Sequence, residues 1–162
     1  MTWKRTIGIG LFVVLTLVFV LSRFYMNVQN QHWDQTAKAV ELAYEKSILA
    51  KAIKVEPFYG DESFQIIYGE DKIGQKLVAW VSEQDVHVEM VDEAFTEEQI
   101  RQLMLDKDPE LEILRVMPGK MKETYVWEVF YKKHENSGVR YFYEYYQFSD
   151  GTYIDTYRLS LQ

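Results

Sequence analysis

The chain has 162 residues, which is enough for one medium domain or two small ones. Residues 1–26 carry three basic residues and no acid, so residues 27–162 hold 15 basic against 25 acidic residues, a net charge of about −10. This charge argues against nucleic-acid binding and against adhesion to anionic lipid, which both require basic surfaces. The absence of cysteine excludes disulfides, a thiolate nucleophile and a cysteine-based zinc site.

An apolar segment near the amino terminus predicts a transmembrane anchor. There is no charged residue from Ile7 to Leu21, and residues 7–26 contain a single charge, Arg23. About 20 such residues span a hydrocarbon core of ~30 Å. A secretory signal peptide is the competing interpretation, but no small-x-small cleavage site follows Leu21, which favours an uncleaved anchor.

Basic residues predict the orientation of this anchor. Lys4 and Arg5 lie in the short segment 1–6, whereas only Arg23 flanks the other end. The positive-inside rule therefore predicts a cytoplasmic amino terminus and an extracytoplasmic carboxy-terminal part, joined to the anchor by a linker over residues 27–32.

Helical periodicity begins at Trp33, with Ala37, Val40 and Ala43 on one face. Asp34 or Thr36 is a candidate cap, and the helix is expected to end near residue 52. Turn-forming segments then separate four predicted strands, at residues 53–59, 63–68, 76–81 and 86–91.

The same order of elements starts again at Thr96. Thr96 and Gln99 form a capping-box pattern, and Pro109 is expected to stop the helix that follows. Asp150 and Gly151 are typical of a tight hairpin turn. Four more strands are predicted, at residues 110–117, 124–132, 139–148 and 152–161.

Aligning the two halves predicts an internal repeat, with domain bounds of 33–93 and 94–162. Each unit is one helix followed by a four-stranded antiparallel sheet, so the fold class is α+β, and the two small units are expected to pack together. In this alignment Leu77, Ala79 and Val81 lie opposite Tyr141, Tyr143 and Tyr145, respectively.

No residue pattern points to catalysis or to a metal. His32, His87 and His134 lack a second histidine at ligand spacing, and the sequence contains no nucleophile elbow, phosphate-binding loop or zinc-protease motif. We therefore expect a non-enzymatic protein with no cofactor, no metal and no catalytic residues.

The segment 139–148, VRYFYEYYQF, holds six aromatic rings. The alignment predicts that Tyr141, Tyr143 and Tyr145 cover the helix that begins at Thr96. The opposite face would then present four residues as a candidate partner surface: Arg140, Phe142, Glu144 and Tyr146. Packing between the two units and stacking against sugars are the alternatives for this face.

The whole chain resembles the TseB-like (YpmB-like) cell-wall elongation regulators of Gram-positive bacteria. The resemblance is carried by the basic amino terminus and anchor, by WDQTAKAV at 33–40, by TEEQI at 96–100 and by the aromatic carboxy-terminal segment 126–160. It implies tandem cystatin-like units related to the PepSY domain. Trp127, Val129, Asp150 and Gly151 match the PepSY-like pattern, whereas the first unit lacks the corresponding glycine.

The resemblance implies a single-pass membrane protein that binds a class B penicillin-binding protein of the elongation machinery and regulates peptidoglycan synthesis and cell shape. It implies no residue-level site. Two other functions remain open from the sequence: a PepSY-type modulator of an extracytoplasmic protease, and a module that binds wall polymers. The sequence leaves the oligomeric state open.

Overall fold

A computed structural model describes residues 3–60, 62–83, 85–135 and 138–160, and in its first helix it describes the side chains of residues 7, 12, 14–23 and 35–46. Contacts divide the chain into two units, Met1–Lys38 and Ala39–Gln162. The second unit contains both predicted sheets and the second helix, so they form one compact body.

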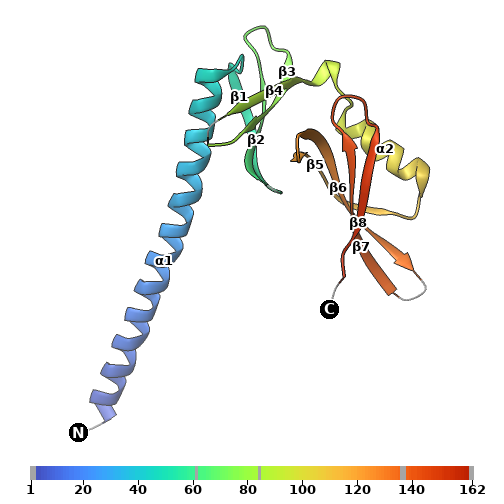
Figure 1. Ribbon diagram of the computed structural model, residues 1–162. Helices are drawn as coiled ribbons and strands as arrows, with labels where there is room; N and C mark the ends of the chain where they lie inside the picture. The colour runs from blue at the N-terminus through green and yellow to red at the C-terminus, as the bar shows by residue number, and fades with distance from the viewer. Residues whose placement is uncertain (1–2, 61, 84, 136–137, 161–162) are drawn as a thin grey trace. The chain divides into compact units, whose positions relative to one another are not determined.

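Helix α1 is continuous from Trp3 to Lys46 (Figure 1). The predicted start near Asp34 or Thr36 is wrong, because the backbone is already helical before both residues and across segment 27–32. The helix also ends earlier than expected. The Ser47 hydroxyl donates to the Ala43 carbonyl oxygen at 2.6 Å and accepts from the Leu49 amide at 3.1 Å, which turns the chain out of the helix.

The residues whose side chains are described include only part of segment 7–26. Among them, no helix is long and apolar enough to cross a membrane.

The first sheet is an antiparallel meander with strand order β1-β2-β3-β4. It confirms the four strands predicted for the first half, and a short 3-10 helix, Val91–Glu93, follows it. The strands are β1 (Lys51–Tyr59), β2 (Ser63–Glu70), β3 (Lys76–Val81) and β4 (Val86–Met90).

Helix α2, Glu97–Lys107, begins with the predicted capping box, because the Thr96 hydroxyl accepts from the Gln99 amide and the Gln99 side chain accepts from the Thr96 amide. The second sheet repeats the order of the first, β5-β6-β7-β8. Its strands are β5 (Glu112–Met121), β6 (Thr124–Glu135), β7 (Gly138–Gln147) and β8 (Tyr153–Arg158). Two antiparallel four-stranded sheets with helices confirm the α+β class.

One face of the first sheet packs against the end of α1. Small side chains at Ala39 and Ala43 allow the helix to approach the sheet closely, and Ala43 is fully buried. The residues of β2 and β3 on this face are Ile67, Leu77, Ala79 and Val81. The predicted helix-facing direction of Leu77, Ala79 and Val81 is therefore correct.

The other face of the first sheet shares a larger core with the second sheet and α2. Trp80 is 1% exposed, and its indole nitrogen donates to the Gly119 carbonyl oxygen in β5 at 3.0 Å. Its ring also meets the Phe148 ring edge-on, with centroids 4.7 Å apart. The fully buried α2 side chains Ile100 and Met104 belong to the same core. The two sheets are thus packed together, as expected for small units.

Each sheet has a β-bulge in its first strand. Ile53 in β1 has no partner in the ladder with β2, because Ala52 pairs with Gly69 and Lys54 with Tyr68. Leu114 in β5 is the corresponding extra residue in the second sheet. Both bulges occupy the third residue of their strand, and both side chains are exposed.

Candidate functional site

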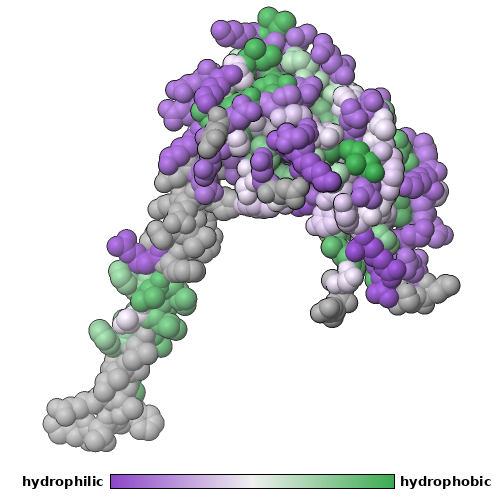
Figure 2. Space-filling model, viewed as in Figure 1, coloured by the Kyte–Doolittle hydropathy of each residue, from purple (hydrophilic) through white to green (hydrophobic). Residues whose placement is uncertain are grey.

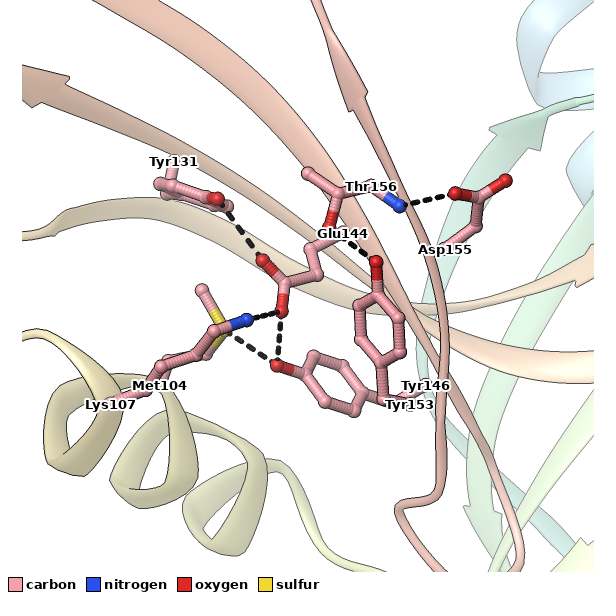
Figure 3. Close-up of polar contacts among 8 residues, drawn as sticks. All are labelled: Met104, Lys107, Tyr131, Glu144, Tyr146, Tyr153, Asp155 and Thr156. Atoms are coloured by element: carbon pink, nitrogen blue, oxygen red, sulfur yellow. Dashed lines mark hydrogen bonds and ion pairs between the residues drawn. The ribbon is translucent and has the colours of Figure 1, made fainter.

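A buried carboxylate lies between the second sheet and α2. Glu144 on β7 is 1% exposed, and its oxygens accept three hydrogen bonds (Figure 3). Donors come from three elements: Lys107 Nζ of α2 at 2.5 Å, the Tyr131 hydroxyl of β6 at 3.0 Å and the Tyr146 hydroxyl of β7 at 2.5 Å. These bonds replace the water that the carboxylate loses on burial.

The cation of this cluster, Lys107, lies where a helix favours a positive charge. Lys107 is the last residue of the helix, where the helix dipole favours a positive charge. Its side chain is 53% exposed, so the ammonium reaches the carboxylate from the rim while keeping water contact. The ammonium also lies 5.3 Å from the centre of the Tyr153 ring of β8.

Both tyrosines of the cluster are held in their protonated form. Burial, followed by the charge of Glu144, raises the pKa of Tyr131 above its usual value, and burial together with the hydrogen bond to Glu144 does the same for the pKa of Tyr146. Each hydroxyl therefore serves as a permanent donor to the carboxylate at neutral pH. The Tyr146 hydroxyl also lies 3.1 Å from the Met104 sulfur, which connects the cluster to the core beneath α2.

A second buried carboxylate, Glu128 on β6, lies on the opposite face of the same sheet. It is 5% exposed, accepts from the Arg115 guanidinium at 2.6 Å and accepts from the Tyr145 hydroxyl at 3.1 Å. Burial, with Glu128 as the next cause, raises the pKa of Tyr145. Both faces of the second sheet thus carry a carboxylate whose charge is matched by a cation within the protein.

Aromatic rings extend from Glu128 across this second face. The Phe130 ring stacks on the rings of Tyr143 and Tyr141, with centroids 4.8 Å and 5.9 Å apart, and the rings of Tyr145 and Tyr157 meet edge-on at 5.8 Å. Strand pairing sets Phe130 opposite Tyr143, and Tyr143 opposite Tyr157. We call this set the tyrosine face; its residues, all partly or largely exposed, are Phe130, Tyr141, Tyr143, Tyr145 and Tyr157.

The predicted directions of the β7 side chains are wrong by one residue. Tyr141, Tyr143 and Tyr145 were expected beneath α2 but lie on the tyrosine face, whereas Tyr146 packs beneath α2 against Met104. The alignment of the two halves caused the error, because its register was shifted by one position and a one-residue shift exchanges the faces of a strand.

The candidate partner surface changes accordingly. Glu144 and Tyr146 are buried, and Phe142 is partly buried with its ring stacked on Tyr131 at 5.2 Å, so none of the three forms an open surface. Arg140 is also partly buried. Packing within the protein, the alternative left open by the sequence, is what the structure shows for this face. The sequence offered a signal: the phenylalanines of the segment, Phe142 and Phe148, both lie on the buried side.

The two buried glutamates of the second sheet form ion pairs. In the part of the chain that the structure describes, no group of three histidine, aspartate or glutamate side chains is arranged to hold a metal ion. Both buried glutamates accept from a cation and from tyrosine hydroxyls, so their oxygens are already occupied. Among the described residues of the second sheet, the tyrosine face is a partly exposed aromatic surface.

Comparisons with known proteins agree with this architecture. Residues 38–82, which run from the end of α1 through β3, match the family model described as the cell wall elongation regulator TseB-like domain. Among solved structures, the YpmB protein from Bacillus subtilis has the same fold, with a TM-score of 0.66 and 23% identity over 76% of this chain and 96% of that chain. No curated protein sequence matches the chain significantly.

The family match covers the end of α1 and the first three strands, and the structural match covers 76% of the chain. The resemblance expected from the sequence is confirmed as a resemblance: residues 38–82 match the TseB-like cell wall elongation regulator domain, and the fold is similar to that of YpmB.

Proposed function

We propose that the protein is a membrane-anchored, extracytoplasmic regulator of cell-wall elongation that binds a class B penicillin-binding protein and has no enzymatic activity of its own. The observation that carries this proposal is the match of residues 38–82 to the TseB-like elongation regulator domain. The fold shared with YpmB supports it. The tandem units are of the cystatin-like type that the family resemblance implies.

Segment 7–26 is the anchor in this proposal. Its single charge is Arg23, and the basic residues Lys4 and Arg5 keep the amino terminus in the cytoplasm. Most side chains described in this segment are apolar and exposed, including Phe12 at 71% and Phe19 at 65%, and Figure 2 shows largely hydrophobic colouring where this part of the helix is coloured. Hydrocarbon chains of a lipid bilayer would cover such side chains.

The paired charges of the second sheet support regulation by binding. A regulator that acts through contact needs a stable surface, and the second sheet supplies one whose internal charges are already paired. The acidic remainder of the ectodomain disfavours binding to anionic wall polymers, so a protein partner is the better fit.

Partner binding is tested by crosslinking the full-length protein in living cells and identifying the captured proteins. We expect a class B transpeptidase of the elongation machinery, and deletion of the gene should make rod-shaped cells shorter or wider. A chain carrying only residues 1–38 is the control, because it retains the anchor without the TseB-like domain. Capture of no transpeptidase, with unchanged cell shape after deletion, would contradict the proposal.

Topology is testable because the chain has no cysteine of its own. A cysteine at the exposed position Ser149 should react with a membrane-impermeant maleimide in intact cells, whereas a cysteine at Thr2 should react only after lysis. Labelling of Thr2→Cys but not of Ser149→Cys in intact cells would reverse the proposed orientation.

A further inference from the structure

Net charge is distributed unevenly over the ectodomain. Residues 27–111 contain 18 acidic and 8 basic residues, whereas residues 112–158, which form the second sheet, contain 7 of each. The whole excess of about ten negative charges therefore belongs to the first sheet and the helices. The second sheet is a neutral region in an acidic protein.

Two ion pairs lie beside the tyrosine face. Arg115 binds Glu128 at 2.6 Å, and Lys132, which pairs with Tyr141 across the strands, binds Glu112 at 2.8 Å. A partner that covers these two pairs would bury charges that are already compensated, which removes the usual obstacle to burying ionic groups. The chemistry complementary to this face is an uncharged, apolar surface.

The orientation of the rings favours a protein partner over a sugar. Stacking against a sugar needs a free ring face, but Tyr141, Phe130 and Tyr143 turn their ring faces toward one another, with interplanar angles of 20° and 23°. The ring faces between these three side chains are therefore covered by one another. Tyrosine, phenylalanine and arginine in this arrangement are typical of protein–protein interfaces.

The same side of the second sheet already packs against protein at its other end. Gly119 and Val126 pair on this side, and the Phe58 ring of the first sheet fills the space that a Cβ atom on Gly119 would need. Val126 is fully buried there, whereas Tyr157 is 51% exposed. The tyrosine face is thus the uncovered continuation of an apolar contact within the protein.

We propose that the tyrosine face contacts the transpeptidase through an uncharged, apolar patch on the extracytoplasmic part of that partner. This inference rests on the proposed function and adds the contact surface to it. A second copy of this chain is a poorer occupant, because association would bring together two domains that each carry about ten negative charges.

Photocrosslinking in living cells tests the surface directly. A photoreactive phenylalanine analogue placed at Tyr157 of the full-length protein should give an adduct with the transpeptidase. The same analogue at Tyr59, which is 69% exposed at the end of β1 on the first sheet, is the matched control and should give none. An adduct with the transpeptidase from Tyr59 but not from Tyr157 would overturn the inference.

Substitutions give an independent measurement. Tyr143→Ala combined with Tyr157→Ala should reduce transpeptidase capture by at least about tenfold, the scale for losing central interface aromatics. Tyr143→Asp should reduce it as strongly, because it places an unpaired charge against an apolar patch. Tyr59→Ala should leave capture unchanged. Equal circular dichroism spectra and thermal midpoints would establish that all variants are folded.

The outcomes distinguish failure of the proposed contact surface from failure of the proposed function. Failure of the unmodified protein to capture a transpeptidase overturns the proposed function. Capture by the unmodified protein that the Tyr143 and Tyr157 variants leave unchanged overturns the tyrosine face alone. Adducts from Tyr157 with a second copy of the chain, or with purified sacculi, would also overturn it by assigning the face to self-association or to glycan.

Discussion

The two sheets share one topology but use their faces differently. The first sheet is covered on both sides, by the end of α1 and by the large shared core, so residues 77–81 of β3 are all buried. The second sheet is covered on one side by α2 and leaves much of the other side partly exposed. Of two sheets with the same topology, one is therefore covered on both faces and the other leaves much of one face partly exposed.

The buried side chains of the two sheets differ in the same way as their coverage. The doubly covered sheet buries uncharged apolar side chains, and β3 carries no charge between Leu77 and Val81. The half-covered sheet contains two buried glutamates, each paired with a cation that reaches it from the protein surface. Buried ion pairs contribute little net stability but penalise alternative arrangements, so the second sheet gains a defined geometry at its faces.

The largest loss of stability is expected where the two sheets meet. Trp80→Ala removes a buried indole together with its hydrogen bond to Gly119, and should lower the free energy of unfolding by about 3–5 kcal/mol. Urea unfolding followed by circular dichroism measures this change. Ile73→Ala, at a side chain that is 79% exposed in the β2–β3 loop, should change it by less than about 0.5 kcal/mol. Equal effects of the two substitutions would mean that the sheets do not depend on a shared core.

Removing either partner of the ion pair beneath α2 should lower the free energy of unfolding by a different amount. Lys107→Met leaves a buried carboxylate without its cation and should cost about 3 kcal/mol. Glu144→Gln leaves a half-exposed ammonium that water can solvate, and should cost about 1.5 kcal/mol. Urea unfolding of both single variants and the double variant would show the order. A larger loss for Glu144→Gln would contradict the role of burial.

Alkaline pH should weaken the second sheet. The pKa values of Tyr131 and Tyr146 are raised in the folded protein, so the folded state retains protons that the unfolded state releases above pH 10.0. The contribution of these two tyrosines to the free energy of unfolding is then constant below this pH and falls above it, by at most about 1.4 kcal/mol per pH unit for each tyrosine. Replacing both tyrosines by phenylalanine should make this decrease shallower, and an unchanged slope would show that the two hydroxyls are not involved.

The smallest effect is expected on the exposed side of α2. Arg101 and Glu97 form an ion pair at spacing i,i+4, with both side chains exposed to a similar extent. Arg101→Ala should therefore lower the free energy of unfolding by only about 0.3–0.5 kcal/mol, and this loss should disappear in high salt. A loss comparable to that of Lys107→Met would mean that exposed charges hold α2 as firmly as the buried pair.

Local sequence signals predicted most of the fold. The capping box at Thr96, the strand β3 and the turn at Gly151, whose φ of 70° suits glycine, were all recognisable from short patterns. The beginning of the helix before the first sheet was not, because candidate caps at Asp34 and Thr36 lie inside a helix that needs no cap there.

The candidate site was less predictable because both sides of β7 are aromatic. Alternation assigns residues to two faces but cannot say which face is covered when hydrophobicity is nearly equal on both. The face therefore had to be chosen from an alignment in which a single-residue shift is decisive. Burial of Glu144 depends on Lys107, which is 37 residues away, and no local pattern reveals a contact between such distant residues.

The paired bulges at Ile53 and Leu114 bear on the solubility of the protein. Both lie on strands at the edge of their sheets, where unpaired amides and carbonyls could join a strand from another molecule. A bulge bends the strand and interrupts the regular spacing of these groups. The same third residue in both first strands therefore interrupts one edge of each sheet, which makes that edge a poorer template for a strand from another molecule.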